Sequence, residues 1–320
     1  MQSRMPYNQY QLSEIVKSLQ ENHISPLKFT YFAGGASRFM AVNSHPKYGI
    51  PQIETRLLRN KIINVFQDMA KPSTLNVLDI GCGDGRKAKE VLSCLTQWSI
   101  VKYLPIDISA GMLTNAIRTV RGNDQLGSIE IQDIESDFEE IDEIKSNQIR
   151  KHKKYQNSLL LFLGNILGNV QSPEKVLNGV IKLMDPGDHM LVGIDLWNQD
   201  KIQEIRQQYE FREMFDLVFT TLEYLGAKQG DGEFDVLVDQ DDHEVKIMFK
   251  FNRVWEYTLP FQIHYRTITA HFEKGDSVQL ASSYRFSKRK LAEIMRNIHL
   301  PDSQTYEDDA GTFLLINFIK

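Results

Sequence analysis

The residues best suited to chemistry form a glycine-rich run directly after a short apolar segment. Gly81-Cys82-Gly83-Asp84-Gly85 follows Val77-Leu78-Asp79-Ile80, which has the composition of a buried strand. Glycines at the end of such a strand let the backbone turn sharply and approach a ligand that a Cβ would exclude. The run is therefore a candidate loop for binding a cofactor.

Two acidic positions follow at the ends of the next predicted strands. Asp107 comes 24 residues after Gly83, where a carboxylate can accept both hydroxyls of a ribose. Asp133-Ile134 ends the following strand, within reach of an adenine edge. An adenosine-containing ligand explains all three features, whereas glycines that serve only as a tight turn leave both acids unexplained.

The glycine spacing separates the classes of adenosine ligand. The dinucleotide fingerprint requires a third glycine where this chain has Arg86, and no phosphate-binding G-K-[ST] is present. The run V-L-D-I-G-C-G-D-G instead resembles motif I of the class I methyltransferases that depend on S-adenosylmethionine (SAM). The resemblance implies SAM as cofactor and S-adenosylhomocysteine (SAH) as product.

Strand and helix patterns alternate around this loop. The predicted strands cover residues 77–80, 100–106, 128–134, 158–163, 189–196 and 312–319. The predicted helices have apolar stripes after Ser109, a candidate N-cap, and after Ser172-Pro173-Glu174, with another near 287–298. This order predicts an α/β fold, a Rossmann-like class I methyltransferase sheet.

Two segments depart from the alternation. Residues 1–59 mix a helical pattern with a glycine-rich aromatic stretch, and residues 197–286 pass from helical to strand-like patterns, including 245–258 and 261–272. We expect these two segments to form an α+β substrate-binding domain. Residues 60–196 and 287–320 then form the SAM-binding core.

A narrower resemblance covers most of the chain. It is carried by Tyr31-Phe-Ala-Gly-Gly-Ala-Ser-Arg-Phe39, by Pro46-Lys-Tyr48 with Glu54-Thr-Arg56, by Phe162-Leu-Gly-Asn-Ile-Leu-Gly-Asn169, and by Ser283-Tyr-Arg-Phe286. Together these resemble the family of L-histidine Nα-methyltransferases of ergothioneine biosynthesis. Fungal N-methyltransferases that act on a prenylated tryptophan are related to that family.

The resemblance implies roles for individual residues. Positions implied to contact the cofactor are Tyr31, Gly81, Gly83, Lys87, Asp107, Asp133 and Ile134. Positions implied to contact the substrate are Phe39, Tyr48, Asn169, Tyr209, Ala281 and Ser283. Asn169 matches the asparagine that holds the amino and carboxylate end of the amino acid, and Tyr209 a tyrosine that binds the carboxylate. Tyr48 and Asn169 are the candidates for positioning the nucleophile, although neither is a strong general base.

Ala281 departs from the family pattern. Histidine-specific members carry a glutamate two positions before the pocket serine, where it accepts a hydrogen bond from the imidazole. An imidazole bound without that acceptor leaves a polar group unpaired, which costs roughly 1–3 kcal/mol. We therefore expect an aromatic, tryptophan-like amino acid or derivative as substrate instead of histidine.

Two other functions remain open. One is a SAM-dependent methyltransferase of another small molecule, with an indole carbon, nitrogen or hydroxyl as nucleophile. The other is a catalytically silent SAM-binding protein that acts through interactions. The presence of Gly81, Gly83, Asp107 and Asn169 argues against a silent protein.

Composition limits the cellular setting and the partners. A net charge of −5 offers no basic footprint for nucleic acid, and the eight histidines include no H-x-x-x-H pair for a metal. The two cysteines and the absence of a signal-peptide pattern or a long apolar run predict a cytoplasmic, non-membrane protein. The expected partner is a small-molecule substrate, and the oligomeric state stays open.

Overall fold

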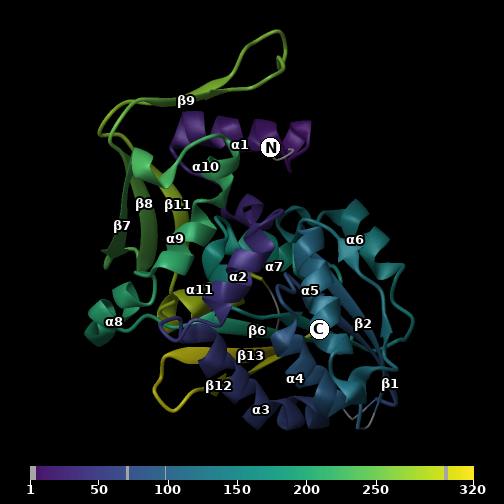
Figure 1. Ribbon diagram of the computed structural model, residues 1–320. Coiled ribbons are helices and arrows are strands. Elements are labelled where there is room, and N and C mark those ends of the chain that lie inside the picture. Colours follow the sequence, from purple (N-terminus) through teal and green to yellow (C-terminus); the bar gives the residue numbers. More distant parts are fainter. Residues whose placement is uncertain (1–4, 70–71, 98, 299–301) are drawn as a thin grey trace. The chain divides into compact units, whose positions relative to one another are not determined.

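The computed structural model describes residues 5–69, 72–97, 99–298 and 302–320 (Figure 1). The chain forms two compact units, each built from two stretches. The large-sheet unit comprises Gly49–Asn198 and Arg285–Lys320, and the small-sheet unit comprises Met1–Tyr48 and Gln199–Tyr284. The predicted boundary at residue 60 falls inside a helix that begins at Ile50.

The large-sheet unit contains a mixed sheet with the strand order β12-β13-β6-β5-β1-β2-β3, and β4 also pairs with β2. Its strands are β1 (Thr74–Ile80), β2 (Ile100–Asp107), β3 (Glu130–Ile131), β4 (Ile134–Glu135), β5 (Ser158–Phe162), β6 (His189–Asp195), β12 (Asp302–Glu307) and β13 (Phe313–Ile319). Its α-helices are α3 (Ile50–Asp68), α4 (Arg86–Leu95), α5 (Ala110–Arg121), α6 (Glu143–Arg150), α7 (Pro173–Ile181) and α11 (Lys288–Asn297). Strands β1 to β6 pair in parallel, whereas β13 pairs antiparallel with both β6 and β12. This arrangement confirms the predicted Rossmann-like fold.

The sequence explains why these elements form. Every residue of β5 and β6 is buried, as expected for central parallel strands covered on both faces. Ser109 caps α5 by accepting a hydrogen bond from the amide of Met112, as predicted. Helix α7 begins at Pro173 as expected, but the side chain of Ser172 makes no capping hydrogen bond.

Two features of the sheet differ from expectation. The third strand, predicted over residues 128–134, is split into the two-residue strands β3 and β4, and Gln132 and Asp133 between them belong to neither strand, although the amide of Gln132 still donates a hydrogen bond to the carbonyl of Tyr103 on β2 at 3.0 Å. Strand β12 was not predicted. Its half-polar sequence lies at the edge of the sheet, where it pairs only with β13.

The small-sheet unit has a three-stranded antiparallel sheet, in the order β11-β8-β7, and a two-stranded hairpin. Its strands are β7 (Gly232–Asp239), β8 (Glu244–Phe251), β9 (Trp255–Thr258), β10 (Thr269–Phe272) and β11 (Ser277–Tyr284). Its α-helices are α1 (Gln9–Asn22), α2 (Gly35–Asn43), α8 (Ile202–Gln207), α9 (Arg212–Val218) and α10 (Thr220–Tyr224). A chain of aromatic rings forms much of its core and includes Phe219, Phe234, Phe249, Phe251, Trp255 and Phe272.

The hairpin corrects one predicted strand. Strand structure expected over 261–272 is confined to Thr269–Phe272. The chain reverses at His264 and Tyr265, whose φ angles of 48° and 63° lie in the left-handed region. Two consecutive residues in that region form a tight hairpin turn, so the aromatic composition of this stretch belongs to a turn and not to a longer strand.

Candidate functional site

The glycine-rich run turns sharply at the carboxyl end of β1. Gly81, Gly83 and Gly85 have φ angles of 64°, 55° and 73°, which side chains with a Cβ rarely adopt. A Cβ on Gly81 would also lie 2.6 Å from Cδ1 of Ile166. The turn itself therefore requires glycine, and Gly81 also admits the segment after β5 at close range.

Asp107, at the end of β2, is bonded directly to this loop. Its Oδ2 accepts a hydrogen bond from the amide of Gly83 at 3.2 Å, and its Oδ1 accepts one from the amide of Ser109 at 3.0 Å. Burial raises the pKa of Asp107 to about 6, and the backbone hydrogen bonds counter part of that rise. A carboxylate has about four acceptor sites, so this one is held in place and can still accept ribose hydroxyls.

A second buried acid lies on β1, two residues before Gly81. Asp79, on β1, accepts a hydrogen bond from the hydroxyl of Tyr103 at 2.7 Å. Burial raises the pKa of Asp79 to about 7, although Tyr103 and the positive charge of Lys87 both act to lower it. Asp84 in the loop pairs with Arg86, so the residue that replaces the third glycine of a dinucleotide fingerprint folds back onto the loop itself.

Lys87, near the start of α4, forms an ion pair with a fully buried carboxylate. Oε2 of Glu54, on α3, lies 3.2 Å from Nζ of Lys87. Oε1 of Glu54 accepts a hydrogen bond from the amide of Gly164 at 2.8 Å. A Cβ on Gly193 would lie 1.9 Å from Oε1, which explains a glycine in the middle of the central strand β6.

Asp133 lies short of the sheet edge that carries the glycine loop. It is exposed between β3 and β4, whereas Glu135 pairs with Asp107 at the end of β2. Because parallel strands end at a common edge, the residues after Glu135 reach the level of the loop. The cofactor contacts of Asp133 and Ile134 stay predictions.

Phe138 lies at this edge and was not singled out by the sequence. Its ring packs edge-on against Phe162, with 5.7 Å between the centroids, and a Cβ on Gly81 would be 3.2 Å from it. Residues 138–140 lie in an acidic run and form a single turn, with the ring of Phe138 against the sheet. A lone aromatic residue among acids was the signal that could have identified it.

The segment after β5 carries Asn169. Asn165 adopts a left-handed conformation (φ 53°), and its Oδ1 accepts a hydrogen bond from the amide of Asp195 at 3.0 Å. The following short 3-10 turn, Ile166–Asn169, ends at the half-buried Asn169. This segment is thus anchored to the end of β6 at Asn165 and to α3 through Gly164.

In the small-sheet unit, the predicted aromatic residues form two pairs. The rings of Tyr31 and Phe39 lie edge-on with 5.6 Å between their centroids, and those of Tyr48 and Tyr209 lie edge-on at 6.0 Å. Tyr209 is only 4% exposed. Its hydroxyl is buried and has no hydrogen-bond partner within the described part of the chain. A buried hydroxyl without a partner is costly, so this atom is a candidate for contact with a ligand.

Ala281 and Ser283 share one face of β11. A bulge at Leu280 shifts the alternation, so that Ala281 pairs with Ile247 and Ser283 with Val245. Ile247 and Val245 are buried residues of β8. The two predicted substrate positions therefore lie on the same face of the sheet as the buried Ile247 and Val245, with Ser283 buried and Ala281 half-buried, and no carboxylate occurs at position 281.

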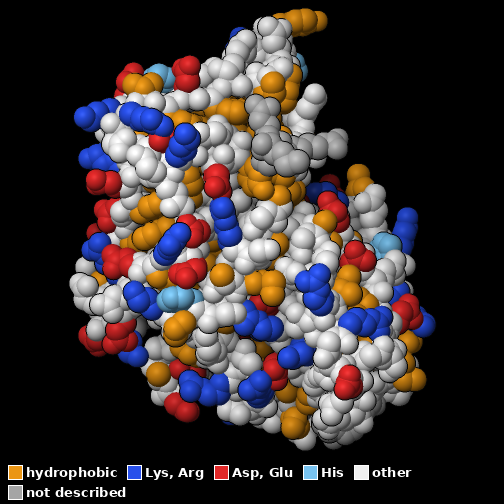
Figure 2. Space-filling view, in the orientation of Figure 1, with side chains coloured by type: hydrophobic (Ala, Val, Ile, Leu, Met, Phe, Trp, Pro, Cys, Tyr) orange, Lys and Arg blue, Asp and Glu red, His pale blue; other side chains and the backbone are white. Residues whose placement is uncertain are grey.

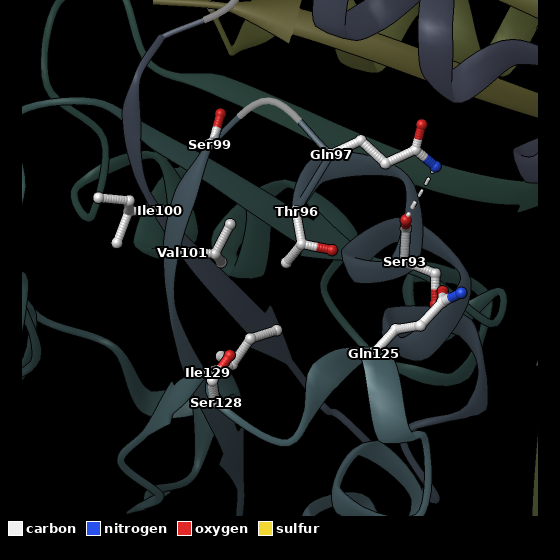
Figure 3. A pocket seen from close by; sticks show the side chains of 9 residues that line it. All are labelled: Ser93, Thr96, Gln97, Ser99, Ile100, Val101, Gln125, Ser128 and Ile129. Atoms are coloured by element: carbon white, nitrogen blue, oxygen red, sulfur yellow. Dashed lines mark hydrogen bonds between the residues drawn. The ribbon is translucent and has the colours of Figure 1, made fainter.

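A separate hollow lies at the start of β2, at the other end of this strand from Asp107 (Figure 3). Hydroxyl and amide side chains line it, among them Ser93, Thr96 and Gln125, with Ile100 at the start of the strand. Asp107 lies seven residues further along β2, or about 23 Å at ~3.3 Å per residue. This hollow is thus distinct from the glycine loop.

Three further observations concern surface charge, metal ligands and membrane-spanning helices. On the face drawn in Figure 2, basic and acidic side chains are interspersed. Among the described residues, no group of three or more His, Cys, Asp or Glu could hold a metal ion. No helix within the described ranges has both the length and the apolar character needed to cross a membrane.

The residues at the edge of the large sheet fit SAM. The glycine turn has φ angles suited to glycine, the buried carboxylate of Asp107 is hydrogen-bonded to that turn and has acceptor capacity left, and the partly exposed ammonium of Lys87 is a cation of the kind that pairs with a carboxylate. Among solved structures, the chain resembles a CurJ carbon methyltransferase with a TM-score of 0.51 and 12% identity. The match covers 95% of this chain and 63% of that one, so this chain spans less than two thirds of its length. The fold and the glycine loop with its acid define a class I methyltransferase.

The family follows from the sequence match. Residues 11–319 match the family described as histidine-specific methyltransferase, SAM-dependent, and the chain belongs to that family. It is 23% identical over 269 residues to the N-methyltransferase fsqC of Aspergillus fumigatus. The aligned region covers 82% of this chain and 70% of that protein. A Burkholderia thailandensis 1,6-didemethyltoxoflavin-N1-methyltransferase solved with SAH has 13% identity and a TM-score of 0.40, covering 90% of this chain and 88% of that one. The predictions of fold, cofactor and methyltransferase class are confirmed.

Proposed function

We propose that this SAM-dependent methyltransferase methylates the amino nitrogen of an amino acid or amino-acid derivative with an aromatic, tryptophan-like side chain. The family match and the N-methyltransferase relative support nitrogen as the acceptor atom. The observation that carries the choice of substrate is Ala281, which lies opposite the apolar Ile247. A carboxylate at this position would accept a hydrogen bond from an imidazole, and alanine offers none.

Tyr209 supports an acceptor with a polar head group. Its buried hydroxyl has no partner within the described residues, and a substrate carboxylate would satisfy it. Phe39, Tyr48 and Ser283 are proposed as further substrate contacts. Asn169 is proposed to hold the amino and carboxylate end of the substrate.

The cofactor residues are proposed as follows. Asp107 accepts the ribose hydroxyls, Gly81 and Gly83 admit the cofactor to the backbone, and Lys87 faces the carboxylate of its amino-acid part. Tyr31 is proposed as a further contact. SAM supplies a methyl group already activated on a sulfonium, so the protein needs only to align and desolvate the acceptor.

The chemical step needs the amine in its neutral form. The nitrogen lone pair forms the new N–C bond as the S–CH3 bond breaks, and the sulfur keeps that electron pair. The methylated nitrogen is then a positively charged ammonium and releases one proton to water. Asn169 and Tyr48 are proposed to orient the nitrogen, and neither needs to be a strong base.

A turnover panel tests the proposal. Purified protein with SAM is offered L-tryptophan, L-histidine, L-tyrosine, tryptamine, indole and phenol, and mass spectrometry with NMR locates any added methyl group. We expect N-methylation of an aromatic amino acid, with lower kcat/KM for histidine. Methylation at carbon or oxygen, or preferred turnover of histidine, would overturn it.

A further inference from the structure

We propose that Glu54 is a positioning residue for the SAM site, holding the ammonium of Lys87 and the segment after β5 in the geometry that receives the amino-acid carboxylate of the cofactor. This inference rests on the proposed cofactor role of Lys87. Glu54 itself lies in α3, well outside the glycine loop, and is not expected to touch the cofactor.

The two oxygens of Glu54 have separate tasks. Oε1 accepts the amide hydrogen of Gly164 at 2.8 Å, and Oε2 lies 3.2 Å from the ammonium of Lys87. One carboxylate thus connects α3 with α4, the helix that follows the glycine loop, and with the segment that follows β5. The carboxylate is fully buried, so it must be compensated by a cation and by hydrogen-bond donors.

Two glycines make room for this arrangement. A Cβ on Gly164 would lie 2.4 Å from Nζ of Lys87, and one on Gly193 would lie 1.9 Å from Oε1 of Glu54. Gly164 also has a φ of 94°, which only glycine adopts readily. The ammonium of Lys87 therefore lies against the backbone of Gly164, at the same edge of the sheet as the glycine loop.

Lys87 remains partly accessible while Glu54 is not. The lysine side chain is 20% exposed, against 0% for Glu54. An ammonium has three donor hydrogens, so Lys87 can serve Glu54 and still donate to an incoming carboxylate. Glu54 then fixes where that donor points, and the cofactor meets a preorganised cation.

Glutamine cannot replace Glu54 in this role. The site needs two acceptors, one for an amide N–H and one for an ammonium. A carboxamide has one acceptor oxygen and one NH2 donor, so Glu54→Gln places a donor against a donor. We expect the affinity for SAH to fall about tenfold, which corresponds to ~1.4 kcal/mol.

Asp188 provides a matched control within the same unit. Its Oδ1 accepts from the amide of Ser158 at 2.7 Å, and its Oδ2 lies 3.0 Å from Nζ of Lys153. It is almost fully buried, but it lies just before β6, at the opposite end of the strands from the glycine loop. Asp188→Asn therefore removes a buried carboxylate that has the same kinds of partner, a backbone amide and a lysine ammonium, at a position away from the proposed SAM site.

The experiment measures the binding of two ligands by calorimetry. SAH carries the amino-acid carboxylate, whereas 5′-methylthioadenosine keeps the adenosine and thioether and lacks that carboxylate. We expect Glu54→Gln and Lys87→Met to weaken SAH about tenfold, with less than a twofold change for 5′-methylthioadenosine. Asp188→Asn should change neither affinity.

The outcomes separate the possible failures. Equal weakening of both ligands by Glu54→Gln, or the same loss from Asp188→Asn, reduces Glu54 to a structural residue and overturns the proposal. Loss of SAH binding in Lys87→Met alone retains the lysine assignment and removes Glu54. Unchanged SAH binding in Lys87→Met overturns the lysine assignment itself, whereas the turnover panel tests the acceptor independently. If Glu54→Gln does not fold, Glu54→Asp keeps two acceptors on a shorter arm and must show the same preference between the ligands.

Discussion

The carboxylate of Asp107 accepts a hydrogen bond from the backbone amide of Gly83 at 3.2 Å. The glycine turn after β1 and the acid at the end of β2, 24 residues apart, are therefore connected directly, and the hydrogen bond stabilises the turn. The same bond fixes the direction of the carboxylate before any ligand arrives. A cofactor that uses Asp107 consequently meets an acceptor already in place.

Asp107→Ala should weaken SAH binding about tenfold or more. The substitution removes both the proposed acceptor of the ribose hydroxyls and the acceptor of the Gly83 amide hydrogen bond, and hydrogen bonds to charged groups contribute about 1.5–3 kcal/mol. Isothermal calorimetry with SAH measures the effect. An unchanged dissociation constant would remove Asp107 from the cofactor site.

The affinity for SAH should fall as the pH is lowered through about 6. Burial raises the pKa of Asp107 to about 6, so its carboxyl becomes protonated below that pH and loses acceptor capacity. Above pH 7 the carboxylate is ionised and the affinity should be level. Calorimetry from pH 5 to pH 8 checks this, and Asp107→Asn should give weaker binding with a flatter profile. Identical pH profiles for the two proteins would contradict the assignment.

Asp79 should make the stability of the protein depend on pH. Burial raises the folded-state pKa of Asp79 to about 7, above the ordinary aspartate value of 3.8, so the folded state retains a proton that the unfolded state releases. This contribution to stability is therefore present at low pH and is lost as the pH rises through about 7. We expect Asp79→Asn to gain stability relative to the original protein between pH 4 and pH 7, by about 1 kcal/mol or more. Urea unfolding at several pH values tests this, and parallel stability curves would refute it.

Tyr209→Phe should affect the acceptor and spare the cofactor. The change removes a buried hydroxyl that has no partner in the described residues, so the fold should lose little or nothing. If the hydroxyl binds the substrate carboxylate, KM should rise roughly tenfold. The test compares KM for an amino acid identified in the turnover panel with the Kd for SAH. A large loss of thermal stability, with KM unchanged, would mean that the hydroxyl has a structural role.

Ala281→Glu should shift preference toward histidine. The new carboxylate would lie two residues from Ser283 on the same face of β11 and could accept a hydrogen bond from an imidazole. We expect histidine binding to improve about tenfold relative to aromatic amino acids, measured by calorimetry in the presence of SAH. Ala281→Gln, which has nearly the same shape without the charge, serves as the control. No change in relative affinity would show that position 281 does not face the substrate.

Much of the fold could be predicted because it depends on local patterns. An uninterrupted apolar run identified β5, and a serine ahead of an amphipathic stripe identified the start of α5. Asp107 and the glycine loop could be recognised for the same reason, since each follows a strand directly. The split third strand escaped because its pairing with β2 depends on a partner distant in sequence.

The amino-acid sequence by itself determined the class of fold, the glycine turn and the acid that serves it, because strand ends and glycine spacing are local properties. Only the tertiary structure decided that Glu54 pairs with Lys87 and Gly164, that Asp133 stops short of the loop, and that Ala281 and Ser283 share a sheet face with Ile247 and Val245. These depend on strand register, on a bulge and on the approach of a helix to a glycine in a central strand. Such relationships arise when distant segments pack together, and local sequence spacing does not specify them.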